Sequence, residues 1–354
     1  MIADTDIFHQ AMLPSGGRFD VTSAAAPAYW LALKSVATQM IEGMNQFMPR
    51  MPKVHFDFVS NPELQAYAFT DQGRYFIGFF SGTVYLLDLV FCRMMCDRRV
   101  LPRIGNVVLE RKEPQSLAGM TLDAERACNA GLSLLLPNCP ARLEYKCRLL
   151  EWAFRFLVSH EIGHIAGGHV DYMDKEYGLP FLAELGWTGQ SESETMLRQS
   201  LELEADAQGA GSLATNMPQR ATNHAHPLSL EDCVFGSVFA FCSLFRLLGD
   251  ATFSGREATQ AYPPVRVRQM LCAEQGIQMI KKWPADVRET CLDKVVEAVN
   301  AAEQILPLLT GEPVSIAGLT EAFGKTGKDY AEKLRQHHLS VTEPALRPYK
   351  YHDF

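Results

Sequence analysis

Three histidines and a glutamate occur within one short stretch of the sequence, SHEIGHIAGGH at positions 159–169. His160 and His164 are four residues apart, so on an α-helix their side chains lie one turn apart on the same face. Two neutral imidazoles in that arrangement can bind one Zn²⁺. Glu161 then lies beside the ligands, where a general base can take a proton from a water that the metal activates. The spacing therefore predicts a zinc site.

A catalytic zinc ion needs a third protein ligand and an open fourth position for water. The stretch ELEAD offers Glu202 and Asp206, which are four residues apart and share a helix face, whereas Glu204 is turned away from them. We expect Glu202 to be the third ligand and Asp206 to accept a hydrogen bond from the other N–H of a ligand histidine. Alone, such a stretch indicates a solvated acidic face, but downstream of H-E-x-x-H it indicates a ligand.

The third histidine of the motif stretch, His169, is a poor candidate ligand. A third histidine ligand is expected six positions after the second one, and that position holds Val170. His169 comes one residue too early. We expect it to be a histidine at a helix end or one that supports a ligand.

The two motifs together resemble the gluzincin metallopeptidases of the HtpX and CAAX-prenyl-protease type, in which H-E-x-x-H is followed by E-x-x-A-D. Residues 61–87 resemble that group's hairpin, in which two strands joined by a Gly-containing turn precede a Gly and a helix. The stretch YPPVRVRQM resembles its H-P-P-x-x-x-R element. Arg268 matches the arginine, whereas Tyr262 replaces the histidine, so the role of that histidine is unassigned here.

The pattern H-E-x-x-H-x-x-x-x-H followed by E-x-E-A-D is also similar to the Lit type of phage-exclusion peptidase. The shared segments are scattered blocks within residues 54–270. The resemblance implies a zinc-dependent endopeptidase that acts on an intracellular protein.

The elements that must position the motifs are mainly helices. Residues 148–158 carry apolar side chains near the helical period, so the motif lies within a helix. We expect residues 171–198, rich in Gly, Asp, Glu and Ser, to form a loop over the cleft between the two metal-binding helices. A second loop is expected at 216–229 and an irregular tail at 343–354.

The N-terminal part is predicted to supply a sheet. The first 60 residues indicate a strand, a helix from Pro27 and a strand with alternation at Val54, Phe56 and Phe58. A hairpin follows at 65–80 with its turn at TDQG. We expect an α+β fold, mostly helical and zincin-like, with a small mixed sheet packed on the motif helix. Its edge strand should face the site.

The expected organisation is a single zincin-like domain over residues 1–310. Its sheet and helix part covers 1–140, and its metal-binding helical part covers 141–310. Residues 311–354 should form a C-terminal helix and the irregular tail. The sequence of 354 residues contains no internal repeat, low-complexity tract or long linker.

Composition narrows the partners and the compartment. The 33 basic and 41 acidic residues give a net charge of −8, which disfavours nucleic acids and anionic membranes as partners. Asp88 and Arg246 interrupt the longest apolar runs, so we expect no membrane span. The first residues lack the features of a signal peptide. The 9 cysteines form no C-x-x-C pair and indicate free thiols in a reducing cytoplasm.

These features predict a zinc endopeptidase whose substrate is a protein or peptide. Besides zinc, the developing oxyanion needs a donor, and the candidates are Tyr262, Arg268, His224 and His226. Tyr262 is the first choice because a phenol can donate and its position matches the family's histidine. We expect substrate backbone to add as a strand along residues 74–80. The oligomeric state is left open.

Three alternatives differ in class or relationship. A peptide deformylase is excluded because its cysteine ligand lies in a Gly-Cys-Leu-Ser-like segment, which this sequence lacks. A repressor-cleaving regulator of the ImmA type remains, since ELEADAQGAGSLATNMP is faintly similar to its E-x-E-A-N…L-M-P helix. The hairpin and the arginine element favour the gluzincin resemblance over this alternative. The third alternative is a non-catalytic binding protein with a structural metal closed by four protein ligands.

Overall fold

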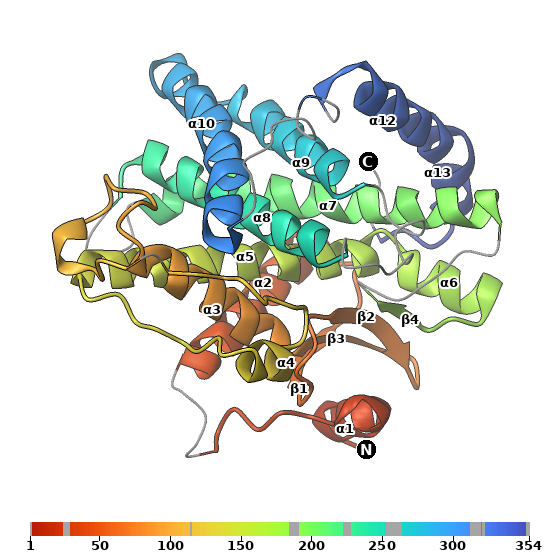
Figure 1. Cartoon of the computed structure of the whole chain (residues 1–354). Coiled ribbons are helices and arrows are strands. Elements are labelled where there is room, and N and C mark those ends of the chain that lie inside the picture. The colour runs from red at the N-terminus through yellow and green to blue at the C-terminus, as the bar shows by residue number, and fades with distance from the viewer. Residues whose placement is uncertain are drawn as a thin grey trace.

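The computed structural model describes residues 2–23, 29–113, 115–183, 191–221, 228–252, 264–311, 320 and 323–351. It is a mostly helical α+β arrangement with one four-stranded mixed sheet. The long helix α5 runs through the middle, between the sheet with α2 and α3 on one side and α7 to α10 on the other (Figure 1). The helices of the described residues are α1 (Asp4–Met12), α2 (Tyr29–Phe47), α3 (Ser81–Cys96), α4 (Ala124–Asn129), α5 (Pro140–Ala166), α6 (His169–Tyr177), α7 (Glu192–Ala221), α8 (Leu230–Thr252), α9 (Val265–Ile280), α10 (Ala285–Thr310), α12 (Lys325–His337) and α13 (Glu343–Leu346).

The sheet has the strand order β1-β3-β2-β4. Strands β2 (Ala66–Asp71) and β3 (Arg74–Phe80) form the predicted antiparallel hairpin, and β1 (Val54–Val59) pairs with β3 in parallel. Gln72 and Gly73 make the turn with φ of 50° and 72°. Two successive positive φ values are those of a type I′ turn, which matches the twist of the flanking strands. The hairpin prediction is confirmed, with its turn inside TDQG.

The expected docking of substrate along residues 74–80 is wrong. Strand β3 pairs with β1 on one side and with β2 on the other, so both its edges are already hydrogen-bonded. The edges of the sheet are β1 and the short strand β4 (Phe181–Ala183), which pairs with β2. A hairpin read from sequence shows two paired strands but does not reveal a third strand that covers one of them.

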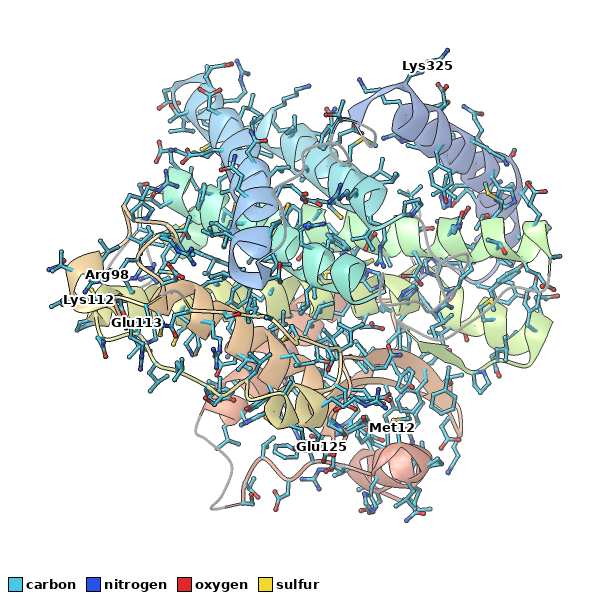
Figure 2. All side chains as sticks on the ribbon, in the orientation of Figure 1. Met12, Arg98, Lys112, Glu113, Glu125 and Lys325 are labelled. Atoms are coloured by element: carbon cyan, nitrogen blue, oxygen red, sulfur yellow. The ribbon has the colours of Figure 1, made fainter. Side chains whose placement is uncertain are left out.

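Alternating side chains on the strands fill two faces of the sheet. On the α5 face, Phe56, Phe58 and Phe79 surround Phe154 of α5. The opposite face is covered by α1, whose buried residues pack with Val59, Phe69, Phe76 and Phe80. Met12 is among these residues of α1, and side chains fill the space between α1 and the sheet (Figure 2). The sheet is therefore buried on both faces, and its inner face positions α5.

Helix α5 begins with Pro140, whose ring suits the first helical turn because no backbone N–H is needed there. Its residues from 152 to 166 are all buried. The helix contacts α2, α3, α7, α8 and strands β2 and β3. Gly167 and Gly168 end it, and Gly168 has a φ of 72°, which turns the chain into α6. The H-E-x-x-H motif thus lies in the last turns of a helix that is held on all sides.

Several predicted loops are regular structure. The strand expected before Pro27 is helix α1, and residues 171–198 contain most of α6, strand β4 and the start of α7. Helix α6 is polar in composition. It has Asp171 in its first turn, and Gly178, in the left-handed conformation, ends it. Helix α7 continues to residue 221 into the second predicted loop, and residues 343–346 of the predicted irregular tail form α13. Within the described residues, no helix has the length and apolarity needed to cross a bilayer.

Candidate metal centre

Three predicted ligands meet between α5 and α7. The Nε2 atoms of His160 and His164 are 3.1 Å apart. The carboxylate of Glu202 lies 3.5 Å from His160 Nε2 and 3.7 Å from His164 Nε2. The possible ligand atoms of all three residues lie within 4.8 Å of one another. This group could hold one metal ion, as the spacing of the two motifs predicts.

The close approach of α5 and α7 brings the ligands together, and the glycine inside the motif allows it. A Cβ added at Gly163 would lie 3.1 Å from the Cα of Ala205 and 3.1 Å from the Cβ of Gln208. A second glycine, Gly209 of α7, faces Phe156, whose ring would be 2.9 Å from an added Cβ. Small residues at both crossing points let the helix backbones approach, so Glu202 reaches the two histidines.

The environment keeps His164 neutral. His160 and Glu202 are 0% exposed and His164 is 2% exposed. Burial lowers the pKa of His164 well below its usual value, and the nearby guanidinium groups of Arg198 and Arg268 lower it further. A neutral imidazole is the form that binds a metal ion. His164 is therefore prepared as a ligand by its surroundings.

Asp206 and Arg268 support the first histidine. Asp206 Oδ1 lies 3.0 Å from His160 Nδ1. Arg268 of α9 donates two hydrogen bonds to the same carboxylate, from Nε at 2.7 Å and from Nη2 at 2.9 Å. Burial would raise the pKa of Asp206, but Arg268 and His160 hold it below its usual range. An ionised Asp206 can accept a hydrogen bond from an N–H at His160 Nδ1, which leaves Nε2 for a metal ion.

Glu202 has the features of a metal ligand. Its two oxygens accept no hydrogen bond from any residue that the structure describes. Arg198 Nε lies 3.4 Å from one oxygen and Arg268 Nη2 lies 3.5 Å from the other. A buried carboxylate without hydrogen bonds is costly, and a divalent cation would offset that cost. The donor set of two imidazoles and one carboxylate suits zinc.

The other predicted site residues divide into two groups. Glu161 is on α5, directly after His160, and is 1% exposed. Tyr262, His224 and His226, the further candidates for stabilising the oxyanion, lie outside the described residues. Their roles remain predictions.

His169 and Glu204 occupy places that the spacing only partly indicated. His169 Nδ1 lies 2.9 Å from His164 Nδ1, on the side of the ring away from Glu202. Glu204 projects from another face of α7 than Glu202 and pairs with Lys350 at 2.6 Å. Sequence reasoning missed Lys350, because 146 residues separate it from Glu204 and no local pattern connects them.

Comparisons with known proteins leave the relationship at the level of the motifs. No protein-family model matches the chain, and neither curated proteins nor solved structures show a significant match. The functional conclusion therefore depends on the site itself: a buried group of His160, His164 and Glu202 that could bind a metal ion.

Proposed function

We propose that this chain is a zinc-dependent endopeptidase of the gluzincin kind, with a zincin-like arrangement of the motif helix on a mixed sheet. The observation that carries the proposal is the convergence of His160, His164 and Glu202 from two helices. No fourth ligand joins this group from the described residues. Three ligands with one open position are typical of catalytic zinc, whereas structural zinc is normally closed by four.

The chain's own residues would perform the proton transfers. Zinc held by His160, His164 and Glu202 would lower the pKa of a water molecule to about 7 and would polarise a carbonyl. Glu161 takes a proton from the attacking water as the C–O bond forms. It then gives that proton to the amine nitrogen as the C–N bond breaks. Tyr262 is the proposed donor to the developing oxyanion.

Little of the site faces solvent in this arrangement of the chain, because all three ligands are at most 2% exposed. We propose that the substrate or an activating partner displaces a covering segment before cleavage. Such gating would restrain idle proteolysis inside a cell.

The same burial favours a second candidate function, a non-catalytic binding protein in which the metal stabilises the fold. Both candidates require zinc, and they differ in the need for Glu161. Zinc binding without any cleavage would support the second candidate.

Zinc content tests the ligand set. Purified protein should contain one zinc ion per chain, and Glu202→Ala should lose it because one of three ligands is removed. Glu192→Ala is the matched control, since Glu192 is on the same helix and its side chain is 84% exposed. Elemental analysis after dialysis against zinc gives the stoichiometry. Absence of zinc from the wild-type protein would contradict both candidate functions.

Cleavage tests the role of Glu161. Glu161→Gln should keep its zinc and lower peptide-bond hydrolysis by about 10²- to 10⁴-fold, the usual contribution of a general base. Glu144→Gln, a change on the same helix, should leave hydrolysis unchanged. The measurement is a mass-spectrometric count of new N-termini in a cell lysate incubated with each zinc-loaded protein. Equal cleavage by the wild type and Glu161→Gln would remove Glu161 from the mechanism.

A further inference from the structure

We propose that His169, Glu204 and Lys350 are positioning residues that hold His164 in its metal-binding tautomer and connect the C-terminal segment to the metal centre. This inference rests on the metal site of the proposed function and not on peptidase activity. Its basis is a continuous series of polar contacts from the ligand histidine to a lysine near the end of the sequence.

The contacts follow one another without a gap. His164 Nδ1 lies 2.9 Å from His169 Nδ1. At the other side of that second ring, His169 Nε2 lies 3.3 Å from Glu204 Oε2. Glu204 Oε1 accepts a hydrogen bond of 2.6 Å from Lys350 Nζ. His169 is fully buried, and the side chains of Lys350 and Glu204 are 10% and 19% exposed, so the series is shielded from water most strongly at its histidine end.

The contacts determine where the protons must be. A carboxylate that is paired with a lysine can only accept hydrogen bonds, so its contact with His169 places a proton on His169 Nε2. With that single ring proton, His169 carries a lone pair on Nδ1, which can only accept from His164 Nδ1. His164 therefore carries its own proton on Nδ1 and leaves its Nε2 lone pair directed toward His160 and Glu202. That tautomer is the one a metal ion on the Nε2 side needs.

Lys350 pairs with Glu204 at the end of the series. Glu204 could form a cation site with His338 and Glu343. The ammonium group of Lys350 already pairs with the carboxylates of Glu204 and Glu343, so the chain itself supplies a cation there. The acceptor at the end of the series is thus a carboxylate that is paired with a lysine.

The segment that carries Lys350 is anchored on both sides of it. Tyr351 donates its backbone N–H to the carbonyl of Ala166, at the end of α5. Its hydroxyl donates to Asp171 of α6 at 2.7 Å. Tyr349 lies against Gly168, where an added Cβ would be 2.5 Å from the tyrosine backbone. Because its neighbours are fixed to the helix ends around the motif, Lys350 has a defined position.

The two ligand histidines are therefore supported in parallel ways. His160 reaches a carboxylate directly, in Asp206, and Arg268 neutralises that carboxylate. His164 reaches the carboxylate of Glu204 through an additional histidine, His169. Lys350 pairs with Glu204 as Arg268 pairs with Asp206. Supports of this kind typically contribute 10- to 100-fold to metal affinity.

The experiment measures zinc affinity and the tautomer of His164 in Glu204→Ala and Lys350→Met. Competition with a chelator gives the affinity, and ¹⁵N NMR of metal-free protein with labelled histidine gives the tautomer. We expect both variants to bind zinc about 10- to 100-fold more weakly, with one zinc per chain at saturation. The Nδ1–H form of His164 should become a mixture of tautomers. The signals are assigned with His164→Gln.

Tyr349→Phe is the matched control, because Tyr349 is in the same segment but its hydroxyl bonds to Glu176. It should keep the wild-type affinity and tautomer. If Glu204→Ala and Lys350→Met both kept the wild-type zinc affinity and the wild-type tautomer, the inference would be overturned. If Glu204→Ala fails to fold, Lys350→Met alone tests the inference. Failure of the wild type to bind zinc would instead contradict the proposed function, and the tautomer measurement would still decide the inference.

Discussion

At the scale of the residue, charged groups inside the protein have partners that sequence alone does not reveal. Asp88 interrupts an apolar run, and that interruption argued against a membrane span. In the fold it pairs with Lys146 of α5 at 2.6 Å, with side-chain exposures of 4% and 7%. Burial would lower the pKa of Lys146, but the charge of Asp88 and its hydrogen bond raise it. The pair joins α3 to α5 within the core.

Removal of one partner should cost more than removal of both. Asp88→Ala leaves a buried ammonium group, and we expect a loss of about 3–5 kcal/mol in the free energy of unfolding. Asp88→Leu combined with Lys146→Met should be nearly neutral, because no charge remains to be buried. Urea unfolding of the three proteins is the measurement. A single-variant loss below that of the double variant would contradict this account.

The same pair predicts a pH dependence at alkaline pH. The folded protein raises the pKa of Lys146 above its ordinary value of 10.5. Its contribution to stability is therefore complete below that pH and is lost as the pH rises through the folded value. Above pH 10.5 the wild type should therefore lose unfolding free energy relative to the Leu/Met double variant. If the difference in unfolding free energy did not change with pH, the pKa of Lys146 would be the same in the folded and the unfolded protein.

Periodicity explains which site residues could be predicted. His160, His164 and Glu202 were found because a helix places residues four apart on one face, and the convergence of two such faces is what a metal motif encodes. The support of His164 was not predictable in the same way. Lys350 meets Glu204 only through the packing of the C-terminal segment, and no spacing within the sequence carries that information.

At the scale of the element, the crossing of α5 and α7 sets the geometry of the site. The sequence predicted both helices and the hairpin, because their apolar periods are local. It did not predict that β3 is a central strand, since β1 pairs directly with β3 although β2 lies between them in the sequence. It also assigned the polar helix α6 to a loop, because few apolar residues indicate its period.

Gly163 tests the importance of the crossing. Gly163→Val would place side-chain atoms against Ala205 and Gln208, where even a Cβ is at 3.1 Å. We expect a loss of about 1–3 kcal/mol in stability from overpacking, and weaker zinc binding because α7 carries Glu202 away from the histidines. Thermal unfolding and chelator competition measure the two effects.

Gly43 is the matched control for that change. It lies in α2, and an added Cβ would have no atom within 4 Å. Gly43→Ala should stabilise the protein by about 0.5–1 kcal/mol through helix propensity and leave zinc binding unchanged. If Gly163→Val bound zinc as tightly as Gly43→Ala, the close crossing would not be needed for the site.

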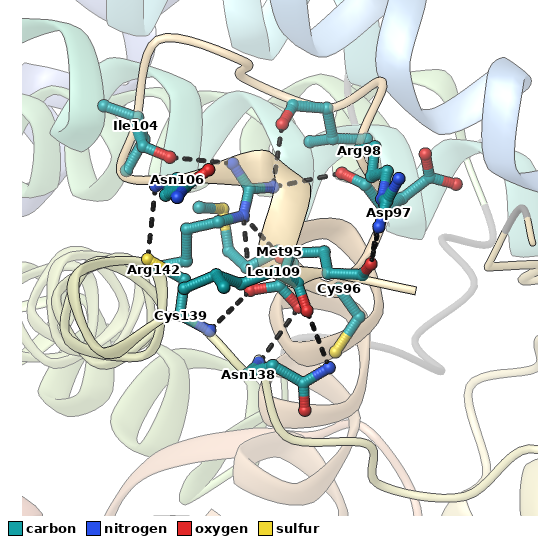
Figure 3. Close-up of polar contacts among 12 residues, drawn as sticks. Met95, Cys96, Asp97, Arg98, Ile104, Asn106, Leu109, Asn138, Cys139 and Arg142 are labelled. Carbon is teal, nitrogen blue, oxygen red and sulfur yellow. Dashed lines mark hydrogen bonds and ion pairs between the residues drawn. The ribbon is translucent and has the colours of Figure 1, made fainter. Parts of the chain in front are cut away.

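At the scale of the whole molecule, α5 connects two regions that depend on it in different ways. The metal ligands are near its C-terminal end. Near its N-terminal end, the fully buried Arg142 binds backbone carbonyl groups at the end of α3 and in the loop that follows (Figure 3). Its guanidinium group donates five hydrogen bonds of 2.7–3.1 Å to the carbonyl oxygens of Met95, Asp97, Val100, Leu101 and Ile104. Glu110, also buried, lies 3.8 Å from Arg142 Nε.

This separation predicts opposite outcomes for the two ends of α5. Arg142→Met would leave several buried carbonyl groups without donors and Glu110 without its cation, so we expect a loss of about 4 kcal/mol or more in the free energy of unfolding. Zinc affinity of the folded variant should equal that of the wild type, because Arg142 is roughly 27 Å along the helix axis from His160. Glu204→Ala should show the reverse, weaker zinc binding with a smaller loss of stability. Urea unfolding and chelator competition on both variants would reveal the contrast, and a zinc affinity that fell in Arg142→Met would mean that the two ends of the helix are coupled.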